Sequence, residues 1–182
     1  MLVESGFARA TTADGAEFTF TPSFGRIAAL GDPQSIVSLY AGLFGPRAAD
    51  EARYVLACLC DQDDATPLIG WVGESRIVHA GAMPAAEQII LARHLMQHGI
   101  CGKAKPESGK SDGKFSDRFD AAEFVSAARV HLGLSSADAE ALSMTEFQGM
   151  LEMKFPDKSK RDVPSRAEYD AAWKRIEERA HV

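Results

Sequence analysis

The stretch 120–156, DAAEFVSAARVHLGLSSADAEALSMTEFQGMLEMKFP, predicts a cluster of short helices, each with its own start and stop signal. Asp120 followed by Glu123 is a variant of the capping box, in which two side chains satisfy the free N–H groups that begin a helix. Apolar residues then recur at helical spacing up to Gly133, which stands where a glycine ends many helices. The first helix is therefore expected to end at Gly133.

Two further helices are predicted in the same stretch. Ser135 or Ser136 begins the second one, which extends through residue 142. Ser143 with Glu146 is another capping box, and Pro156 ends the third helix because proline disfavours helical geometry in the residue before it. Helices this short are not stable alone, so the three must dock on one another or on a partner.

The third of these helices is rich in methionine and phenylalanine. Methionine adapts to irregular apolar shapes and is common on surfaces that bind several partners. We therefore predict a partner-binding surface of six residues: Met144, Phe147, Met150, Leu151, Met153 and Phe155. The alternative is that these side chains form the core of a small C-terminal subdomain, although so small a unit has limited interior for all of them.

Composition bounds the class of protein. The chain has 182 residues, of which 46% are apolar and 25% charged, as in an ordinary globular protein of one or two domains. Its net charge of −6 argues against an electrostatic grip on nucleic acid or on an anionic membrane. Three cysteines are few and odd in number, and neither a signal-peptide leader nor an apolar run of about 18 residues occurs. A cytoplasmic protein with reduced thiols is expected.

The N-terminal residues predict a hairpin. Segments 2–10 and 16–21 are rich in strand formers, and Asp14-Gly15 between them is typical of a tight type I′ turn. Phe18 and Phe20 then lie on one face, by the two-residue period of a strand. A hairpin of two strands is marginal alone, so this face is expected to rest on helices.

Helices are predicted from residue 21 to 60 and from residue 84 to 98, with a second short hairpin from segments 68–72 and 76–79 between them. Ser23 and the pair Asp32-Pro33 are start signals, and Gly99 is expected to end the helix 84–98. A helix that begins near Trp71 is the alternative to the second hairpin. The apolar residues assigned to the core of these helices are Ile36, Val37, Tyr40, Leu43, Phe44, Tyr54, Val55, Cys58, Leu59, Ile89, Ile90, Leu91, Leu95 and Met96.

Residues 103–114, KAKPESGKSDGK, divide the chain. The segment has four lysines and no hydrophobe larger than alanine, so it is predicted to be a flexible linker between an N-terminal domain, 1–102, and a C-terminal helical domain, 115–182. Ser165 with Glu168 predicts a last helix, with Tyr169, Trp173 and Ile176 on one face. The predicted fold class is mainly α with small β-hairpins (α+β): an N-terminal hairpin plus helices, then a C-terminal cluster of short helices.

Patterns for catalysis and metal binding are weak. His94, His98 and Cys101 have a spacing that suits zinc, but a fourth ligand is not evident, and a solvated or interfacial face is the simpler interpretation. Ser75, His79 and an aspartate among residues 61, 63 and 64 lack the glycine pattern of a hydrolase nucleophile, and no phosphate-binding glycine loop occurs. We therefore predict no catalytic, cofactor-binding or metal-binding residues and no enzyme activity.

Two segments carry a resemblance to a known family. Residues 134–147, LSSADAEALSMTEF, resemble the GLS-x-x-A-L-x-M-T-x-x-E stretch of tail assembly chaperones of long-tailed bacteriophages. Residues 18–31, which end in TPSFGRIAALG, together with Asp32-Pro33, are similar to the N-terminal region of phage proteins encoded near the gene for the tail tape-measure protein. In that family a flexible segment joins a globular N-terminal part to a C-terminal extension, often through a programmed frameshift, and the predicted linker fits this layout.

The resemblance implies a protein that coats the tape-measure protein, keeps it soluble and recruits tail-tube subunits. Both proteins are its implied partners, with the host bacterial cytoplasm as its location and absence from the mature virion; self-association is left open, and neither nucleic acid nor membrane is expected as a partner. One alternative is a structural tail or head–tail protein retained in the virion. A helix-turn-helix regulator is the weaker alternative, because the third helix carries Glu146 and Glu152 where a DNA-reading helix presents basic or amide side chains.

Overall fold

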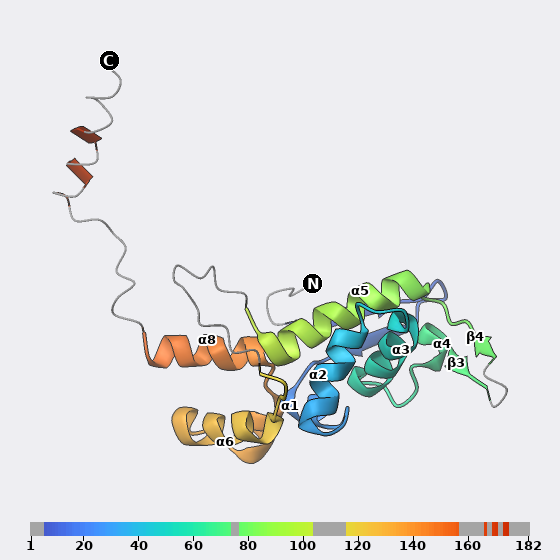
Figure 1. Ribbon diagram of the computed structural model, residues 1–182, viewed down its shortest axis with the longest axis horizontal. Coiled ribbons are helices and arrows are strands. Elements are labelled where there is room, and N and C mark those ends of the chain that lie inside the picture. Colours follow the sequence, from blue (N-terminus) through green and yellow to red (C-terminus); the bar gives the residue numbers. More distant parts are fainter. Residues whose placement is uncertain are drawn as a thin grey trace.

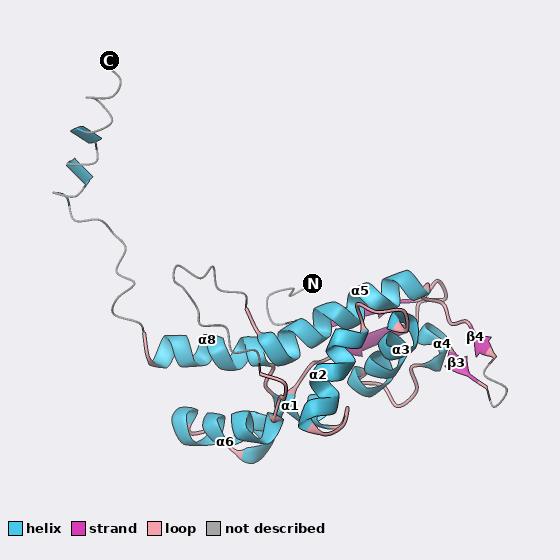
Figure 2. Cartoon of the chain, in the orientation of Figure 1, coloured by secondary structure: helices cyan, strands magenta, loops and turns pink. Residues whose placement is uncertain are grey.

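The computed structural model describes residues 6–73, 77–103, 116–156, 166, 169, 170, 173 and 174. It shows a mainly helical α+β fold with an N-terminal hairpin, which confirms the predicted fold class (Figure 1). Figure 2 shows two small strand pairs among helices. The elements in chain order are β1 (Ala8–Thr11), β2 (Glu17–Phe20), α1 (Phe24–Ala28), α2 (Pro33–Gly42), α3 (Ala48–Leu59), α4 (Thr66–Ile69), β3 (Trp71–Val72), β4 (Val78–His79), α5 (Ala85–Met96), the π-helical turn η2 (Gln97–Cys101), α6 (Ala121–Leu132), α7 (Ser136–Ala141) and α8 (Met144–Lys154).

The N-terminal hairpin forms as predicted, but its turn does not. β1 and β2 are antiparallel, and Phe18 and Phe20 are both buried on the face that rests on the helices. β1 ends at Thr11 and β2 begins at Glu17, and one more backbone bond, from Thr12 N to Ala16 O at 2.9 Å, leaves residues 13–15 as the turn rather than Asp14-Gly15 alone. Gly15 adopts the left-handed φ of 87° in this loop, which a residue with a side chain rarely adopts.

Capping decides where the first helices begin. Ser23 accepts a hydrogen bond from Arg26 N at the start of α1, and Asp32 accepts from the backbone of residues 34 and 35 at the start of α2. Both start signals are therefore confirmed. Pro33 occupies the first turn of α2, where its missing N–H costs no helical hydrogen bond.

The second hairpin is shorter than predicted. β3 and β4 pair antiparallel through two residues each, with Trp71 opposite His79. Residues 68 and 69, which were assigned to its first strand, instead end α4, a single helical turn with Pro67 near its start. Leu68 and Ile69 are buried there, and so the core rather than the strand pattern decides their conformation.

The predicted end of the long helix at Gly99 is wrong. α5 continues without a break into η2, and the chain leaves the helix at Gly102, whose φ is 75°. Gly99 lies against α1, where an added Cβ would come within 2.7 Å of Ile27 Cδ1. This glycine is therefore needed for the close approach of η2 to α1 rather than for a cap.

The stop and start signals of the stretch 120–156 are confirmed, except that Glu123 does not complete the predicted capping box at Asp120: its carboxylate lies 3.8 Å from the guanidinium of Arg118. Asp120 accepts from Ala122 N, Gly133 is left-handed with a φ of 75°, and Ser135 is the residue that begins α7. Ser143 and Glu146 form the reciprocal capping box at the start of α8. Of the predicted last helix, Ser165 and Glu168 lie outside the described residues.

One hydrophobic core joins the N-terminal elements to the C-terminal helices. Phe24 of α1 stacks on Phe124 of α6 with ring centroids 5.7 Å apart, and meets Phe147 of α8 edge-on at 5.9 Å. Figure 1 shows α6 and α8 at one end of the molecule and β3 and β4 at the other. The predicted linker and the division there stay a prediction, because residues 104–115 lie outside the described part of the chain.

Three residues assigned to the core are instead exposed: Phe44, Tyr54 and Ile90. Phe44 packs its ring against the guanidinium of Arg93, which lies 4.4 Å from the ring centroid. The Tyr54 hydroxyl donates to Leu30 O at 3.1 Å, so its polar end holds it at the surface. Among the described residues, no helix is both long and apolar enough to span a membrane.

Candidate partner-binding groove

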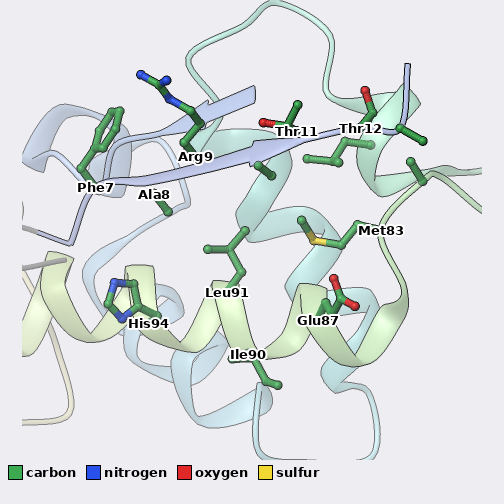
Figure 3. A pocket seen from close by; sticks show the side chains of 14 residues that line it. Phe7, Ala8, Arg9, Thr11, Thr12, Met83, Glu87, Ile90, Leu91 and His94 are labelled. Carbon is green, nitrogen blue, oxygen red and sulfur yellow. The ribbon is translucent and has the colours of Figure 1, made fainter. Parts of the chain in front are cut away.

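A hollow with a mainly apolar lining lies between β1 and α5, and we call it the β1–α5 groove. It encloses about 640 Å³. Residues 7–13 form one side, and Glu87, Ile90, Leu91 and His94 of α5 form the other. Figure 3 shows Met83 near one end of the groove and His94 near the other, with Leu91 directed from α5 toward β1.

The helical period of α5 sets the groove side of the helix. Residues 87, 90, 91 and 94 are spaced three and four apart, so they form one stripe. The opposite stripe is buried and includes Gln88, Ala92 and Leu95. The Gln88 amide donates to Ile69 O at 3.0 Å and to Met83 O at 2.8 Å, which fixes the start of α5 and the Met83 end of the groove.

Small side chains on β1 keep the groove open. Ala8 pairs with Phe20 and Ala10 with Phe18, and directly opposed residues of a hairpin share a face. The alanines therefore lie on the same face as the buried phenylalanines, where a methyl group leaves space above Leu91. The space is suited to apolar side chains brought by another molecule.

Few charges line the groove. The guanidinium of Arg9 lies 3.6 Å from the carboxylate of Glu17, on the exposed side of the hairpin. The carboxylate of Glu87 has no ion pair or hydrogen bond with any residue that the structure describes. The third ionisable group is His94, whose ring lies 4.6 Å from that of His98.

The six residues predicted to bind a partner do not form one surface. Met144 and Phe147 are 4% and 5% exposed and belong to the core, so their assignment to a binding surface is wrong. Met150 and Leu151 are half-buried. Met153 and Phe155, at 78% and 58%, are the exposed members. The face of α8 that carries the first two residues packs on η2 and α6 and, through Phe147, on Phe24 of α1. Helical periodicity alone does not distinguish such a face from a free one.

The weak metal and hydrolase patterns gain no support from the geometry. No group of three ligating side chains suited to a metal occurs within the described ranges. His98 Nδ1 instead lies 2.7 Å from Thr145 Oγ1 of α8, and Cys101 is exposed at the end of η2. Ser75 lies outside the described residues, and His79 stacks on Trp71 with ring centroids 3.9 Å apart.

A second hollow of about 810 Å³ lies beside the β3–β4 hairpin. Its lining mixes the charged side chains of α3, among them Asp50 and Arg53, with apolar ones of the hairpin. Trp71, Val72 and Val78 are each about half exposed beside it. This second surface is more polar, and the Asp50–Arg53 ion pair at 3.1 Å already satisfies two of its charges.

Sequence reasoning did not find the β1–α5 groove. Its signals were present: alanines at alternate positions of a predicted strand and an isoleucine, Ile90, at the edge of the apolar stripe of α5. β1 and α5 are more than seventy residues apart in the sequence and come together only in the tertiary structure. Neither local pattern predicts that they form two sides of one groove.

Fold and groove together define a small α+β protein with a mainly apolar groove between β1 and α5. The sequence profile of a family of unknown function, DUF6246, matches residues 41–171, and the chain belongs to that family. α5 lies within the matched residues and β1 before them. No curated protein and no solved structure matches the chain.

Proposed function

We propose that the protein is a bacteriophage tail assembly chaperone that binds the tape-measure protein, keeps it soluble and recruits tail-tube subunits. The observation that carries the proposal is the β1–α5 groove, an apolar site of about 640 Å³ on the surface of an acidic protein. The resemblance of residues 134–147 and 18–33 to tail assembly chaperones supplies the identity of the partner.

The groove supports the proposal through what it offers to an unassembled partner. In this proposal, a tape-measure protein that is not yet enclosed by the tail tube exposes apolar side chains. Leu91, Met83 and Ile90 of the groove can cover some of them. The net charge of −6 keeps the complex soluble, because molecules of like charge repel one another. Binding and solubility require no chemical step, so the proposed protein is not an enzyme and uses no cofactor.

The exposed apolar side chains at the other end of the molecule suit the second partner. Val130 of α6 and Met153 and Phe155 at the end of α8 are all exposed. The groove and this C-terminal surface lie on different elements, and two separate surfaces let one chaperone hold two partners at once. We propose that the groove binds the tape-measure protein, that the C-terminal surface contacts tail-tube subunits, and that the protein acts in the host cytoplasm and is absent from the mature virion.

The test is co-expression with the tape-measure protein, with its soluble fraction as the readout. We expect the soluble fraction to rise with the intact chain and to fall back with Ile90→Asp, which places a carboxylate at the rim of the apolar groove. Val130→Asp is the matched control: both residues are exposed on helices, and the tail-tube subunits that the surface of Val130 is proposed to contact are absent from this two-protein co-expression. Val130→Asp is expected to keep the soluble fraction at the level of the intact chain.

Two results would contradict the proposal. The chaperone function is contradicted if the soluble fraction of the tape-measure protein does not change and the two proteins do not co-purify. Detection of the chain in purified virions at a fixed stoichiometry favours a structural tail or head–tail protein instead.

A further inference from the structure

The outer edge of the N-terminal hairpin can be identified from the hydrogen bonds of β2. Thr21 N donates to Leu59 O at 3.1 Å, and Asp61 N donates to Thr19 O at 2.8 Å. Backbone groups of successive residues point to opposite edges of a strand, so residues 19 and 21 face the segment 59–61. Residues 18 and 20 therefore face β1.

The same alternation shows which groups of β1 are free. Ala10 pairs with Phe18, and further along Thr12 N donates to Ala16 O at 2.9 Å, so the even-numbered residues of β1 bond to β2. The N–H and C=O groups of Arg9 and Thr11 then point away from β2. No described residue forms a hydrogen bond with them.

This free edge opens onto the groove. Arg9 and Thr11 both line it, with Leu91 of α5 on the opposite side (Figure 3). An unpaired strand edge is a template for another strand, and an extended peptide that adds to such an edge places its alternate side chains in whatever hollow lies beside it. The β1–α5 groove has both an unpaired strand edge and an apolar hollow beside it.

We infer that the groove binds an extended segment of the partner, which adds to β1 as a third strand through the backbone of Arg9 and Thr11. Large aliphatic side chains at alternate positions of that segment fill the space above Leu91. A basic residue at one end pairs with Glu87, whose carboxylate has no partner among the described residues. This inference rests on the proposed function only in taking the groove as the partner-binding site.

A second copy of the chain is a poorer occupant than a partner segment. Two copies of β1 would pair edge to edge, and the side chains brought to the groove face would be those of Ala8 and Ala10. Methyl groups leave most of about 640 Å³ unfilled. Apolar space without contacts contributes little to binding, so longer aliphatic side chains are required.

The test uses the full chain and a fluorescent nine-residue peptide, Lys-Thr-Leu-Thr-Val-Thr-Leu-Thr-Lys, followed by fluorescence anisotropy. Its control has the same composition with the three aliphatic residues adjacent. We expect the alternating peptide to bind about tenfold more tightly than the control. Backbone N-methylation supplies a second readout: methyl groups on the amides of one edge abolish binding, and methyl groups on the other edge do not.

The protein-side variant is Thr11→Pro, which removes one outward N–H and leaves the bonds to β2 in place, as at natural edge prolines. We expect it to weaken peptide binding about tenfold, whereas Thr11→Ala, which keeps the N–H, stays within about twofold. Circular dichroism of both variants confirms that they fold. The inference is overturned if N-methylation of either peptide edge weakens binding equally, or if Thr11→Pro and Thr11→Ala bind the peptide equally well. The first of these results does not depend on the stability of Thr11→Pro.

Failure of this inference and failure of the proposed function give different results. If the peptide binds and only N-methylation of one edge abolishes binding, the strand site is supported. If the chain then has no effect on the soluble fraction of the tape-measure protein, the chaperone function is contradicted. If the chain raises the soluble fraction of the tape-measure protein and Thr11→Pro does not change this effect, the chaperone function is supported and the strand site is overturned. A dimer that Thr11→Pro dissociates, with no peptide binding, assigns the edge to a second copy and also overturns the inference.

Discussion

Ser143 shows how a single residue determines where an element begins. Its hydroxyl accepts from Glu146 N at 3.2 Å, and its own N–H donates to the Glu146 carboxylate at 2.9 Å. The residue is 1% exposed, so water does not replace these bonds when they are lost. Local reasoning from four residues was sufficient to predict this box, because both of its hydrogen bonds are local.

We predict that Ser143→Ala lowers the free energy of unfolding by about 1–2 kcal/mol, measured by chemical denaturation. The control is Ser136→Ala in the first turn of α7, where the exposed hydroxyl bonds, within the described part of the chain, only to the side chain of Glu140. Its cost should stay within about 0.5 kcal/mol. Equal losses for the two variants would show that the buried box has no special role.

At the scale of elements, the junction between η2 and α8 depends on polar contacts. His98 Nδ1 lies 2.7 Å from Thr145 Oγ1. Gln148 accepts from Lys103 N at 3.1 Å and donates to Cys101 O at 3.2 Å. These bonds connect α8 to the end of the helix that forms one side of the groove.

Protonation of His98 is expected to loosen this junction. Burial, followed by the nearby charges of His94 and Lys103, lowers the pKa of His98 below its ordinary value. The unfolded chain takes up this proton near its ordinary pKa of about 6.5, before the folded chain does. Stability is therefore full above about pH 6.5 and is lost as the pH falls toward the depressed pKa of the folded state.

The measurement is the melting temperature between about pH 7 and pH 5, a range that lies above the ordinary pKa values of aspartate and glutamate, about 3.9 and 4.3. His98→Gln removes the titrating group and keeps a hydrogen-bonding side chain near Thr145, so it should flatten the decrease in this range. An equally steep decrease in the variant would assign the pH dependence to other groups.

The elements also show why part of the structure was predictable and part was not. Capping at Ser23, Asp32 and Asp120 is local, and it was correctly assigned. The continuation of α5 through Gly99 was missed because the reason for that glycine is Ile27, more than seventy residues away. The groove was missed for the same physical reason, since it exists only where β1 meets α5.

At the scale of the whole molecule, the continuous core explains why the predicted binding surface on α8 was partly wrong. Met144 and Phe147 lie in the core that α8 shares with α1, so only the exposed end of α8 can meet another protein. A methionine-rich helix predicts a binding surface only when nothing else in the chain covers it, and here η2 and α6 pack against one face of it. The β1–α5 groove is a separate apolar surface, built from other elements of the fold.

The central claim is that the β1–α5 groove is where the partner binds, and site-specific photo-crosslinking tests it most directly. A photoreactive phenylalanine derivative replaces Ile90 in one version of the chain and Val130 in another, both exposed on helices. We expect irradiation of cells that co-express the tape-measure protein to give a crosslink to that protein from position 90 and none from position 130. A crosslink from position 130 without one from position 90 would place the partner on the C-terminal helices and contradict the account.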